Sequence, residues 1–389
     1  MYNYIPLEQA ADILDSYRKP VNSKERLNLI KGKPLDELFP YYGATGQVGW
    51  IDSFLTDGEY ILLGEDGAPF LNPYAEKAYI IYGKTWVNNH AHILRSKTNN
   101  EFLCYYLNYF NYKNYVSGTT RLKLTQAQMR KIPIPNIPSD EQSRIVSRID
   151  ELFSELDKAV DTLKTTKEQL AVYRQAVLKD TFSNIPREMY KPLKLVMEEM
   201  PQNGLYKSKS FYGEGNPILR IDGFYDGEVV PNYEYKRVRL EAEEIKKYAL
   251  HIGDIVVNRV NSMSYLGKCA LIRNLEEPTI FESNVMRFRL DKQQIDLEYA
   301  MYYLSTSFGR HELIKNAKQA VNQASINQTD VGNALIPIPK DLEAQRNIAQ
   351  KISAHIAVCN NIEQGIDTAF AQADAMRQSI LKQAFEGKI

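Results

Sequence analysis

The sequence predicts a mixed α+β protein in which one architecture occurs twice. Each copy is an α/β domain followed by a long helix, and we expect the two helices to pack as an antiparallel coiled coil. Three observations predict this fold. The tetrapeptide IPIP at 132–135 recurs at 336–339. Strand-like runs and glycine-rich loops precede each tetrapeptide, and a heptad pattern of apolar residues follows it.

The internal repeat sets the domain organisation. The two tetrapeptides are 204 residues apart, and a later block, RQxxLKxxF, occurs at 174–182 and again 203 residues later at 377–385. Nearly constant offsets are typical of two divergent copies with loop insertions, here a pseudo-two-fold tandem repeat. We therefore expect a first globular domain at 1–138, a central helix at 139–184, a second globular domain at 185–340 and a C-terminal helix at 341–389.

The globular parts contain short strands between many loops. Runs such as 60–63, YILL, and 255–257, IVV, are β-branched or apolar and are bounded by glycine and polar residues, which is typical of buried strands. Each of these parts therefore reads as a mixed α/β domain.

The two helices carry heptad seams. Pro138 and Ser139 give a helix start, and acidic residues fill the first turn. The expected seam of the first helix alternates steps of four and three: Ile145, Ile149, Leu152, Leu156, Ala159, Leu163, Thr166, Leu170, Tyr173 and Val177. The corresponding seam of the second helix is Ile348, Ile352, His355, Cys359, Ile362, Ile366, Ala369, Ala373, Met376 and Ile380. Seams this long need a partner helix, although each helix packing only on its own domain is the alternative. The first helix would be a rod of about 66 Å.

Composition and charge exclude several classes of protein. No apolar run is long enough for a membrane helix, and three scattered cysteines suit packed thiols in a reducing cytoplasm. Lys plus Arg equals Asp plus Glu, 48 each, which argues mildly against a nucleic-acid binder. A local cluster argues the other way, because residues 102–139 contain no acid. The basic residues of this stretch are Lys113, Arg121, Lys123, Arg130 and Lys131.

No motif in the chain makes a complete catalytic site. The glycine-rich segment 43–49 lacks the GK[ST] end of a phosphate loop, and Asn72-Pro73-Tyr74 lacks the rest of a methyltransferase motif. Asp222, Glu244 and Lys246 are the residue types of a metal-dependent nuclease, but 241–250 reads as an acidic, solvated helix. We expect no catalytic residues and no metal ligands in this chain.

In its order of motifs the chain resembles the specificity subunits of type I restriction–modification systems, the HsdS family. Each helix has a Gln-containing block early, at 141–144 (EQSR) and 344–346 (AQR), and an RQxxLK block late. The second domain matches the family's target-recognition pattern at 219–221, 253–259 (GDIVVNR) and 266–268. The first domain departs from it, since 58–66 (GEYILLGED) lacks the Asn-Arg pair, and it resembles another target-recognition subclass.

The resemblance implies a function in DNA recognition. Each globular domain would be a target-recognition domain reading one half of a bipartite double-stranded DNA site, and the helices would hold the halves apart. Two methyltransferase subunits would dock, with restriction/translocase subunits in the full complex, and S-adenosylmethionine would sit on the methyltransferase partner and not on this chain. The repeated Arg-Gln pairs, expected off the seams, suggest two equivalent docking surfaces.

Side chains that can grip phosphate or read base edges are the candidate DNA contacts. In the first domain they are Thr45, Gly46, Lys84, Thr119, Thr120, Arg121 and Lys123. In the second they are Arg220, Asn258, Arg259, Ser262, Lys268, Gln323, Ser325 and Asn327. Arg121 and Arg259 are the strongest candidates. Three alternatives stay open: the recognition subunit of another multi-subunit methyltransferase–nuclease, a metal-dependent nuclease, and a coiled-coil scaffold without DNA affinity.

Overall fold

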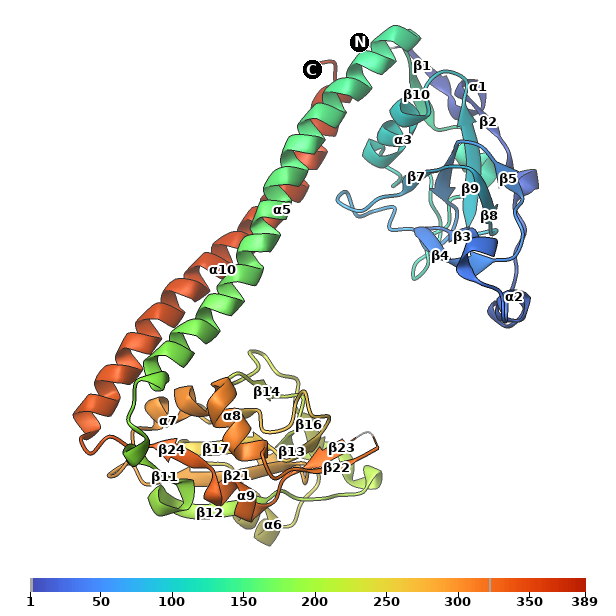
Figure 1. Cartoon of the computed structure of the whole chain (residues 1–389). Helices are drawn as coiled ribbons and strands as arrows, with labels where there is room; N and C mark the ends of the chain where they lie inside the picture. The colour runs from blue at the N-terminus through green and yellow to red at the C-terminus, as the bar shows by residue number, and fades with distance from the viewer. Residues whose placement is uncertain (1–2, 322) are drawn as a thin grey trace. The chain divides into compact units, whose positions relative to one another are not determined.

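The computed structural model describes residues 3–321 and 323–389 and divides the chain into two compact units. Unit 1 comprises Met1–Thr165 with Gly365–Ile389, and unit 2 comprises Thr166–Gln364. The division falls within the two long helices, α5 (Ser139–Ser183) and α10 (Leu342–Phe385), so each unit contains a globular part and a segment of both helices (Figure 1).

The globular part of unit 1 has two four-stranded sheets. Its elements are β1 (Asn3–Pro6), α1 (Leu7–Ala10), β2 (Ala11–Ile13), α2 (Ser23–Ile30), β3 (Phe39–Gly43), β4 (Gly46–Ile51), β5 (Thr56–Asp57), β6 (Tyr60–Gly64), β7 (Ala78–Ile81), β8 (Lys84–Val87), β9 (Ala91–Ser96), α3 (Asn100–Tyr109), α4 (Gln126–Met129) and β10 (Pro133–Asn136). One sheet has the order β2-β9-β6-β7 and is antiparallel throughout. The other has the order β4-β3-β8-β5, with β3 and β8 parallel. The predicted strand at 60–63 is β6, and all five of its residues are buried.

Unit 2 repeats this topology. Its elements are β11 (Tyr190–Pro192), β12 (Met197–Asn203), β13 (Tyr212–Leu219), β14 (Phe224–Tyr225), β15 (Glu228–Val229), β16 (Lys236–Val238), α6 (Ala242–Tyr248), β17 (Asp254–Asn258), β18 (Val260–Asn261), β19 (Cys269–Leu271), β20 (Ile280–Phe281), β21 (Val285–Leu290), α7 (Leu297–Leu304), α8 (Ser307–Ile314), β22 (Lys318–Ala320), β23 (Gln323–Ser325), α9 (Gln328–Asn333) and β24 (Leu335–Pro337). The sheet β12-β21-β17-β19 corresponds to β2-β9-β6-β7, and β16-β13-β20 corresponds to β4-β3-β8, again with a parallel pair. The mixed fold and its repetition are therefore confirmed.

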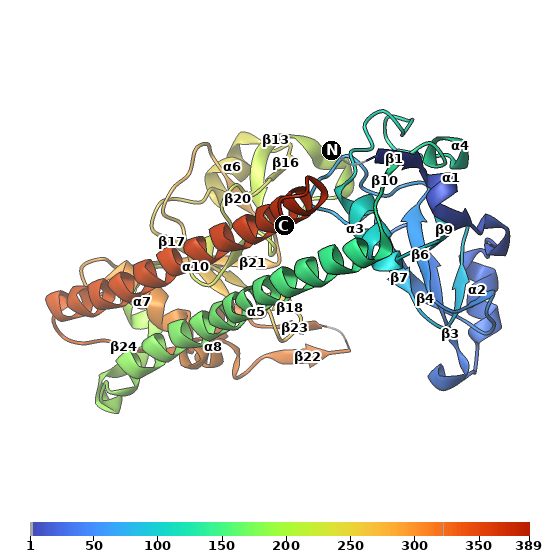
Figure 2. The ribbon, with the colours of Figure 1, turned by 90° about the horizontal axis from the view of Figure 1, so that it is seen from above.

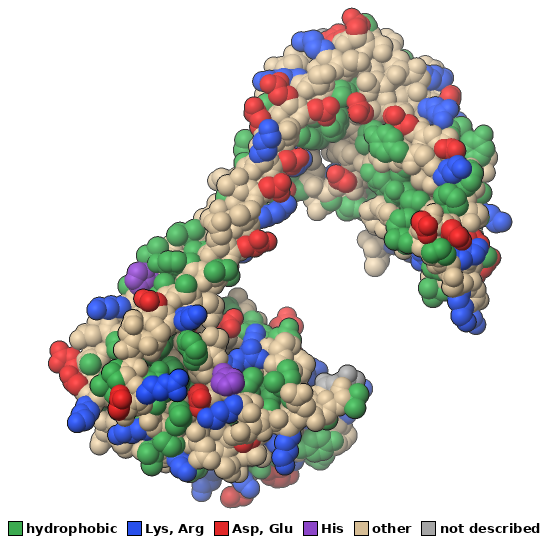
Figure 3. Space-filling view, in the orientation of Figure 1, with side chains coloured by type: hydrophobic (Ala, Val, Ile, Leu, Met, Phe, Trp, Pro, Cys, Tyr) green, Lys and Arg blue, Asp and Glu red, His purple; other side chains and the backbone are tan. Residues whose placement is uncertain are grey.

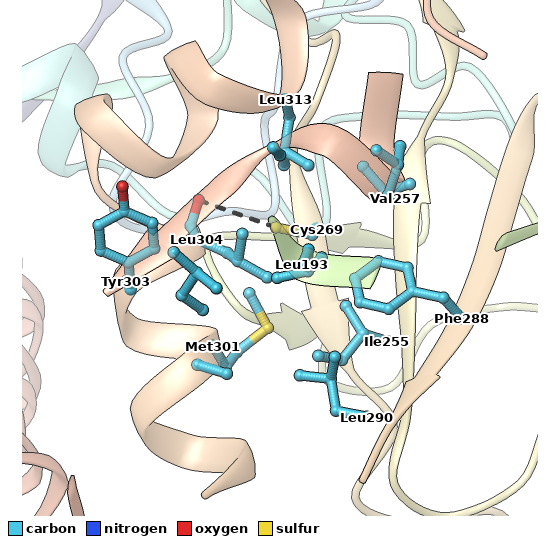
Figure 4. Close-up of a cluster of buried hydrophobic side chains, with 14 of the residues drawn as sticks. Leu193, Ile255, Val257, Cys269, Phe288, Leu290, Met301, Tyr303, Leu304 and Leu313 are labelled. Atoms are coloured by element: carbon cyan, nitrogen blue, oxygen red, sulfur yellow. Dashed lines mark hydrogen bonds between the residues drawn. The ribbon is translucent and has the colours of Figure 1, made fainter. Parts of the chain in front are cut away.

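The core of unit 2 lies between the sheet and the helices. Side chains from β17 and β21 meet α7 and α8, as Figure 4 shows for Ile255, Phe288, Met301 and Leu313. Cys269 lies in this cluster, and its thiol contacts the Leu304 carbonyl at 3.9 Å. Among the described helices, none combines the length and apolar character needed to cross a membrane.

Two of the repeated motifs anchor the start of each helix. The IPIP segments form β10 and β24, which pair with the first strand of their own globular part, β1 and β11. Gln142 and Gln345 are buried, and each side chain caps local carbonyls: Gln142 Nε2 donates to Ile137 O at 3.0 Å and Gln345 Nε2 to Pro339 O at 2.9 Å. The glutamine of the early block therefore fixes the start of each helix.

Within each unit, α5 and α10 lie side by side and antiparallel (Figures 1 and 2). In unit 2 Arg174 of α5 donates to Glu363 of α10 at 2.7 Å, and in unit 1 Arg377 of α10 pairs with Asp157 of α5. Arg377 also lies 4.9 Å from the centre of the Phe153 ring. The expected antiparallel pairing is confirmed.

Part of the expected seam is displaced by one residue. The heptad positions at Ile149, Leu156 and Leu170 of α5 are buried, as are Ile352, Cys359, Ile366 and Ala373 of α10. Some of the alternate expected positions face outward, because Tyr173, His355, Ile362 and Met376 are exposed. The residue after each is less exposed instead, at Arg174, Ile356, Glu363 and Arg377.

Ion pairing explains the displacement at Arg174, Glu363 and Arg377. An inward position can carry a charge when the facing helix supplies the opposite one, and a search for apolar side chains passes over such positions. Arg174 and Arg377 are therefore bonded between helices within each unit, where the sequence reasoning had placed them on a free docking surface.

Candidate nucleic-acid interface

In unit 2 the candidate residues meet at the end of β17. Val260 of β18 pairs with Ser325 of β23, and the Ile326 amide donates to Arg259 O at 3.0 Å. The segments 258–262 and 323–327, more than 60 residues apart in sequence, therefore lie side by side. Strand pairing of β23 with β22 completes a three-stranded sheet at this edge.

Arg259 carries a charge that no acid neutralises. Its Nη1 donates to Ser283 O at 2.8 Å, while its Nε is buried without a partner. No carboxylate of the residues in the described ranges lies within ion-pair distance of the guanidinium, and burial lowers its pKa below the ordinary value. A half-buried cation without a counter-ion is a binding position for an anion or for the acceptor edge of a base.

Asn258 is fully buried, and both polar atoms of its amide lack hydrogen-bond partners. Buried polar groups in native proteins are nearly always satisfied, so an unsatisfied amide beside Arg259 marks an unusual position. The side chain is not presented to solvent in this structure. Asn258 is therefore a buried residue next to the candidates that are presented at the surface.

Lys268 and Ser262 lie on the turn that follows. The Lys268 ammonium is 5.0 Å from the ring centres of both Tyr225 and Tyr265, which hold it by cation–π contact. Ser262 Oγ is 2.9 Å from Ser264 Oγ. The two tyrosines were not among the sequence candidates. Tyr265 is close to Lys268 in the sequence and could have been indicated by that spacing, whereas Tyr225 reaches Lys268 only through folding.

The remaining candidates of unit 2 already have structural partners. Arg220 forms an ion pair with Glu282 at 3.0 Å, and the same carboxylate accepts from the Ile221 amide. Asn327 caps α9, accepting from the amides of residues 329 and 330. Gln323 is exposed and Ser325 half-buried on β23, so these two are presented at the edge.

In unit 1 the corresponding edge is the end of β6. The loop 117–124 folds onto it: Gly67 N donates to Leu122 O at 3.0 Å, and Leu124 N donates to Glu65 O at 2.7 Å. Thr119 and Thr120 are exposed at the tip of this loop. The structure therefore places the acid-free stretch at the position that 323–326 occupies in unit 2.

The cations of this loop are paired with the two acids that directly follow β6. Arg121 donates to Asp66 at 2.9 Å, and Lys123 lies 3.1 Å from Glu65. Asp66 also contacts His90, at 2.6 Å. Where the carbonyl of Arg259 accepts from the Ile326 amide in unit 2, the carbonyl of Glu65 accepts from the Leu124 amide in unit 1, so a carboxylate takes the place of the guanidinium. The sequence showed this only as the missing Asn-Arg pair.

The other three candidates of unit 1 do not all reach this edge. Thr45 and Gly46 lie at the turn between β3 and β4. The carbonyl oxygen of the neighbouring Ala44 lies 3.2 Å from the position that a Cβ atom would occupy on Gly64, at the end of β6. Gly46 has a φ of +130°, a conformation that favours glycine. Lys84 starts β8 at the opposite end of the sheet, over the Phe54 ring at 4.9 Å. The structure therefore groups Thr45 and Gly46 with the loop, and leaves Lys84 apart.

The nuclease residues serve structural roles. Glu244 completes the capping box of α6 and forms an ion pair with Lys207 at 2.6 Å, while Asp222 accepts from the Tyr233 hydroxyl at 2.7 Å. In the described ranges no group of three or more His, Cys, Asp or Glu side chains could hold a metal ion. Figure 3 shows positive and negative side chains intermixed on the visible face, in keeping with the balanced composition.

Comparison with known proteins decides the family. The model of the type I restriction modification DNA specificity domain matches residues 9–170 and again residues 196–369. The chain belongs to this family. The two matches fall on the two copies of the repeat, so each copy is one specificity domain of the family.

Individual members of the specificity family match different shares of the chain. The specificity subunit S.HindORF215P of Haemophilus influenzae is 37% identical over 149 residues, 38% of this chain and 36% of the relative. The type I restriction enzyme EcoKI specificity subunit of Escherichia coli K12 is 25% identical over 307 residues, 74% of this chain and 65% of the relative. The matched regions thus span about a third and just under two thirds of these relatives' lengths.

A solved structure shares the fold. A chain from a study of complex assembly and conformational transition of the type I R-M system aligns over 100% of this chain and 98% of its own length, with a TM-score of 0.68 and 16% identity. At this identity the match shows the fold alone, without showing which residues contact DNA.

Proposed function

We propose that this chain is the DNA sequence-recognition subunit of a type I restriction–modification complex. Each unit reads one half of a bipartite double-stranded site at the edge formed by the end of β6 or β17 and its facing loop. The observation that carries this proposal is the uncompensated Arg259 beside the edge of β23, within a specificity domain of the family. A guanidinium there can grip phosphate or donate two bonds to guanine.

The long helices are the proposed docking surface for two methyltransferase subunits. Apolar side chains off the true seam are exposed on them: Val172, Val358 and Ile362 in unit 2, and Met376 in unit 1. Exposed apolar side chains on helices that already have a partner suit a further protein interface. Two copies of one architecture imply two copies of the methyltransferase, with restriction/translocase subunits joining the full complex.

The chain itself is proposed to be non-catalytic and to act in the cytoplasm, away from any membrane. S-adenosylmethionine belongs to the methyltransferase partner in this proposal. The nuclease alternative is tested by incubating the purified chain with DNA and magnesium. Cleavage without partner subunits would contradict the proposal, and sequence-specific modification only in the presence of the methyltransferase is the expected result.

A further inference from the structure

A buried histidine lies directly beneath the recognition loop of unit 1. His92 of β9 is fully buried, with Nδ1 2.7 Å from Asp15 Oδ2 and Nε2 3.0 Å from Leu124 O. Asp15 begins a short 3₁₀ turn, Asp15–Tyr17, near the start of the chain. The ring therefore connects the N-terminal segment to the last residue of the 117–124 loop.

The partners of this ring decide its protonation state. Asp15 accepts from the Ile93 amide at 3.0 Å and from Gln126 Nε2 at 2.7 Å, and it lies 3.2 Å from Arg18. Burial alone would raise the pKa of Asp15, but the hydrogen bonds from its partners lower it overall. The Ile93 amide, Gln126 and Arg18 favour the carboxylate form without any contribution from His92. A carboxylate only accepts hydrogen bonds, and so does the Leu124 carbonyl. Both ring nitrogens must therefore carry hydrogen, so His92 is an imidazolium.

Charged groups on every side of His92 belong to the same network. Asp15 and Arg18 face it from the N-terminal segment, and Glu65 lies 3.9 Å from Nδ1 at the end of β6. Glu65 is in turn paired with Arg18 and with Lys123 of the loop. The loop end is thus held twice: the Leu124 amide donates to Glu65 O, and the Leu124 carbonyl accepts from His92.

Unit 2 provides a matched comparison within the same chain. His92 pairs with Leu63 across β9 and β6, and the residue in that register position of unit 2 is Met286, which pairs with Val257 across β21 and β17. Met286 is fully buried in an apolar cluster. Of these two equivalent positions, only the one in unit 1 therefore has a side chain that hydrogen-bonds to the loop from beneath.

We propose that the His92 imidazolium is a positioning residue that fixes the Thr119–Lys123 loop for DNA reading by unit 1. Replacing His92 removes both donors, so the Asp15 carboxylate and the Leu124 carbonyl each lose a hydrogen bond. Reading of the unit 1 half-site is therefore weakened by this replacement, while reading of the unit 2 half-site, where the equivalent residue is Met286, is unaffected. The inference rests on the proposed function for its DNA readout only.

The protonation is tested directly on the full-length chain. With ¹⁵N-labelled histidine, the ring nitrogens of His92 are expected to show the shifts of an imidazolium at neutral pH, assigned by their loss in His92→Met. One protonated and one unprotonated nitrogen at that pH would overturn the proposal. This measurement requires no DNA, so it stands apart from any failure of the recognition function.

The positioning role is tested on the complex with its methyltransferase. Two probes each keep one half-site intact, and the binding of each is compared between the wild-type complex and the His92→Met complex. In His92→Met the affinity for the unit 1 probe is expected to fall about tenfold or more relative to the unit 2 probe, a loss appropriate to a buried charged hydrogen bond. Exposed His311→Gln is the control and should leave the affinity for both probes unchanged. An equal loss for both probes in His92→Met, or no loss for either, would contradict the role.

Discussion

Phe385, near the end of α10, packs edge-on against Tyr106 of α3, with ring centres 5.1 Å apart. The same relationship recurs in unit 2, where Phe182 at the end of α5 lies 5.3 Å from Tyr303 of α7. The last aromatic residue of the RQxxLKxxF block is therefore the point at which each helix end joins a globular core.

This packing predicts a large loss of stability when either ring is removed. Phe385→Ala and Phe182→Ala leave cavities among buried rings, and each should lower the free energy of unfolding by about 3–5 kcal/mol. Chemical denaturation measures the change. The control Val358→Ala truncates an exposed helix residue and should change stability by less than about 0.5 kcal/mol. A loss at Phe385 no larger than the control's would show that the helix end is not anchored there.

Arg259→Ala is expected to weaken DNA binding by about 1–3 kcal/mol and to relax specificity within the unit 2 half-site alone. The reason is that Arg259 has no acid to compensate it, so its hydrogen-bonding capacity is available to DNA. Arg237→Ala is the matched control, because that arginine is exposed and paired with Glu277. Binding is measured at fixed salt with the methyltransferase present. Unchanged affinity in Arg259→Ala would remove the main support for the unit 2 interface.

In unit 1 the ion pair between Arg121 and Asp66 must compete with DNA. Asp66→Asn frees the guanidinium, so the slope of log affinity against log salt concentration should steepen by about one. Asp36→Asn, at an exposed site of the same unit, is the control and should leave the salt dependence of binding unchanged. If the two variants behave alike, Arg121 does not contact phosphate.

Lys77 gives a pH dependence of stability that is independent of DNA. Its side chain is buried, with Nζ 3.2 Å from Pro73 O, and burial lowers its pKa from 10.5 to about 8. Between these values the unfolded chain binds more protons, so this lysine makes stability rise with pH, by about 3 kcal/mol in all. Lys77→Met should remove that rise in denaturation midpoints measured from pH 7 to pH 11. A wild-type profile that falls over this range, with no difference from the variant, would contradict the assignment.

The sequence predicted the repeated fold well because its signals are local and occur twice. The Gln of each early block and the Phe of each late block recur at a nearly fixed offset, and both make equivalent contacts in the two units. The seam was harder. Arg174 and Glu363 occupy inward positions because they neutralise each other, and no single-helix pattern shows that pairing.

The sequence indicated where the candidate residues lie better than it indicated the partners of their side chains. The runs 119–123 and 323–327 do lie at equivalent edges, which spacing in the repeat indicated. The partners of each side chain depend on residues distant in sequence. Arg121 meets Asp66 only through folding, and Asn258 is hidden because even-numbered residues of β17 face a second buried cluster that includes Val256.

Exchanging one recognition unit is the most direct test of the account. Residues 190–335 are replaced by the matching segment of a relative with a different recognition sequence, leaving α5 and α10 intact, and the variant is expressed with its methyltransferase. Methylome sequencing of those cells should show a new sequence in one half-site and the original sequence in the other. Change in both half-sites, or modification at the original site unchanged, would contradict the claim that each unit reads its own half of the DNA site.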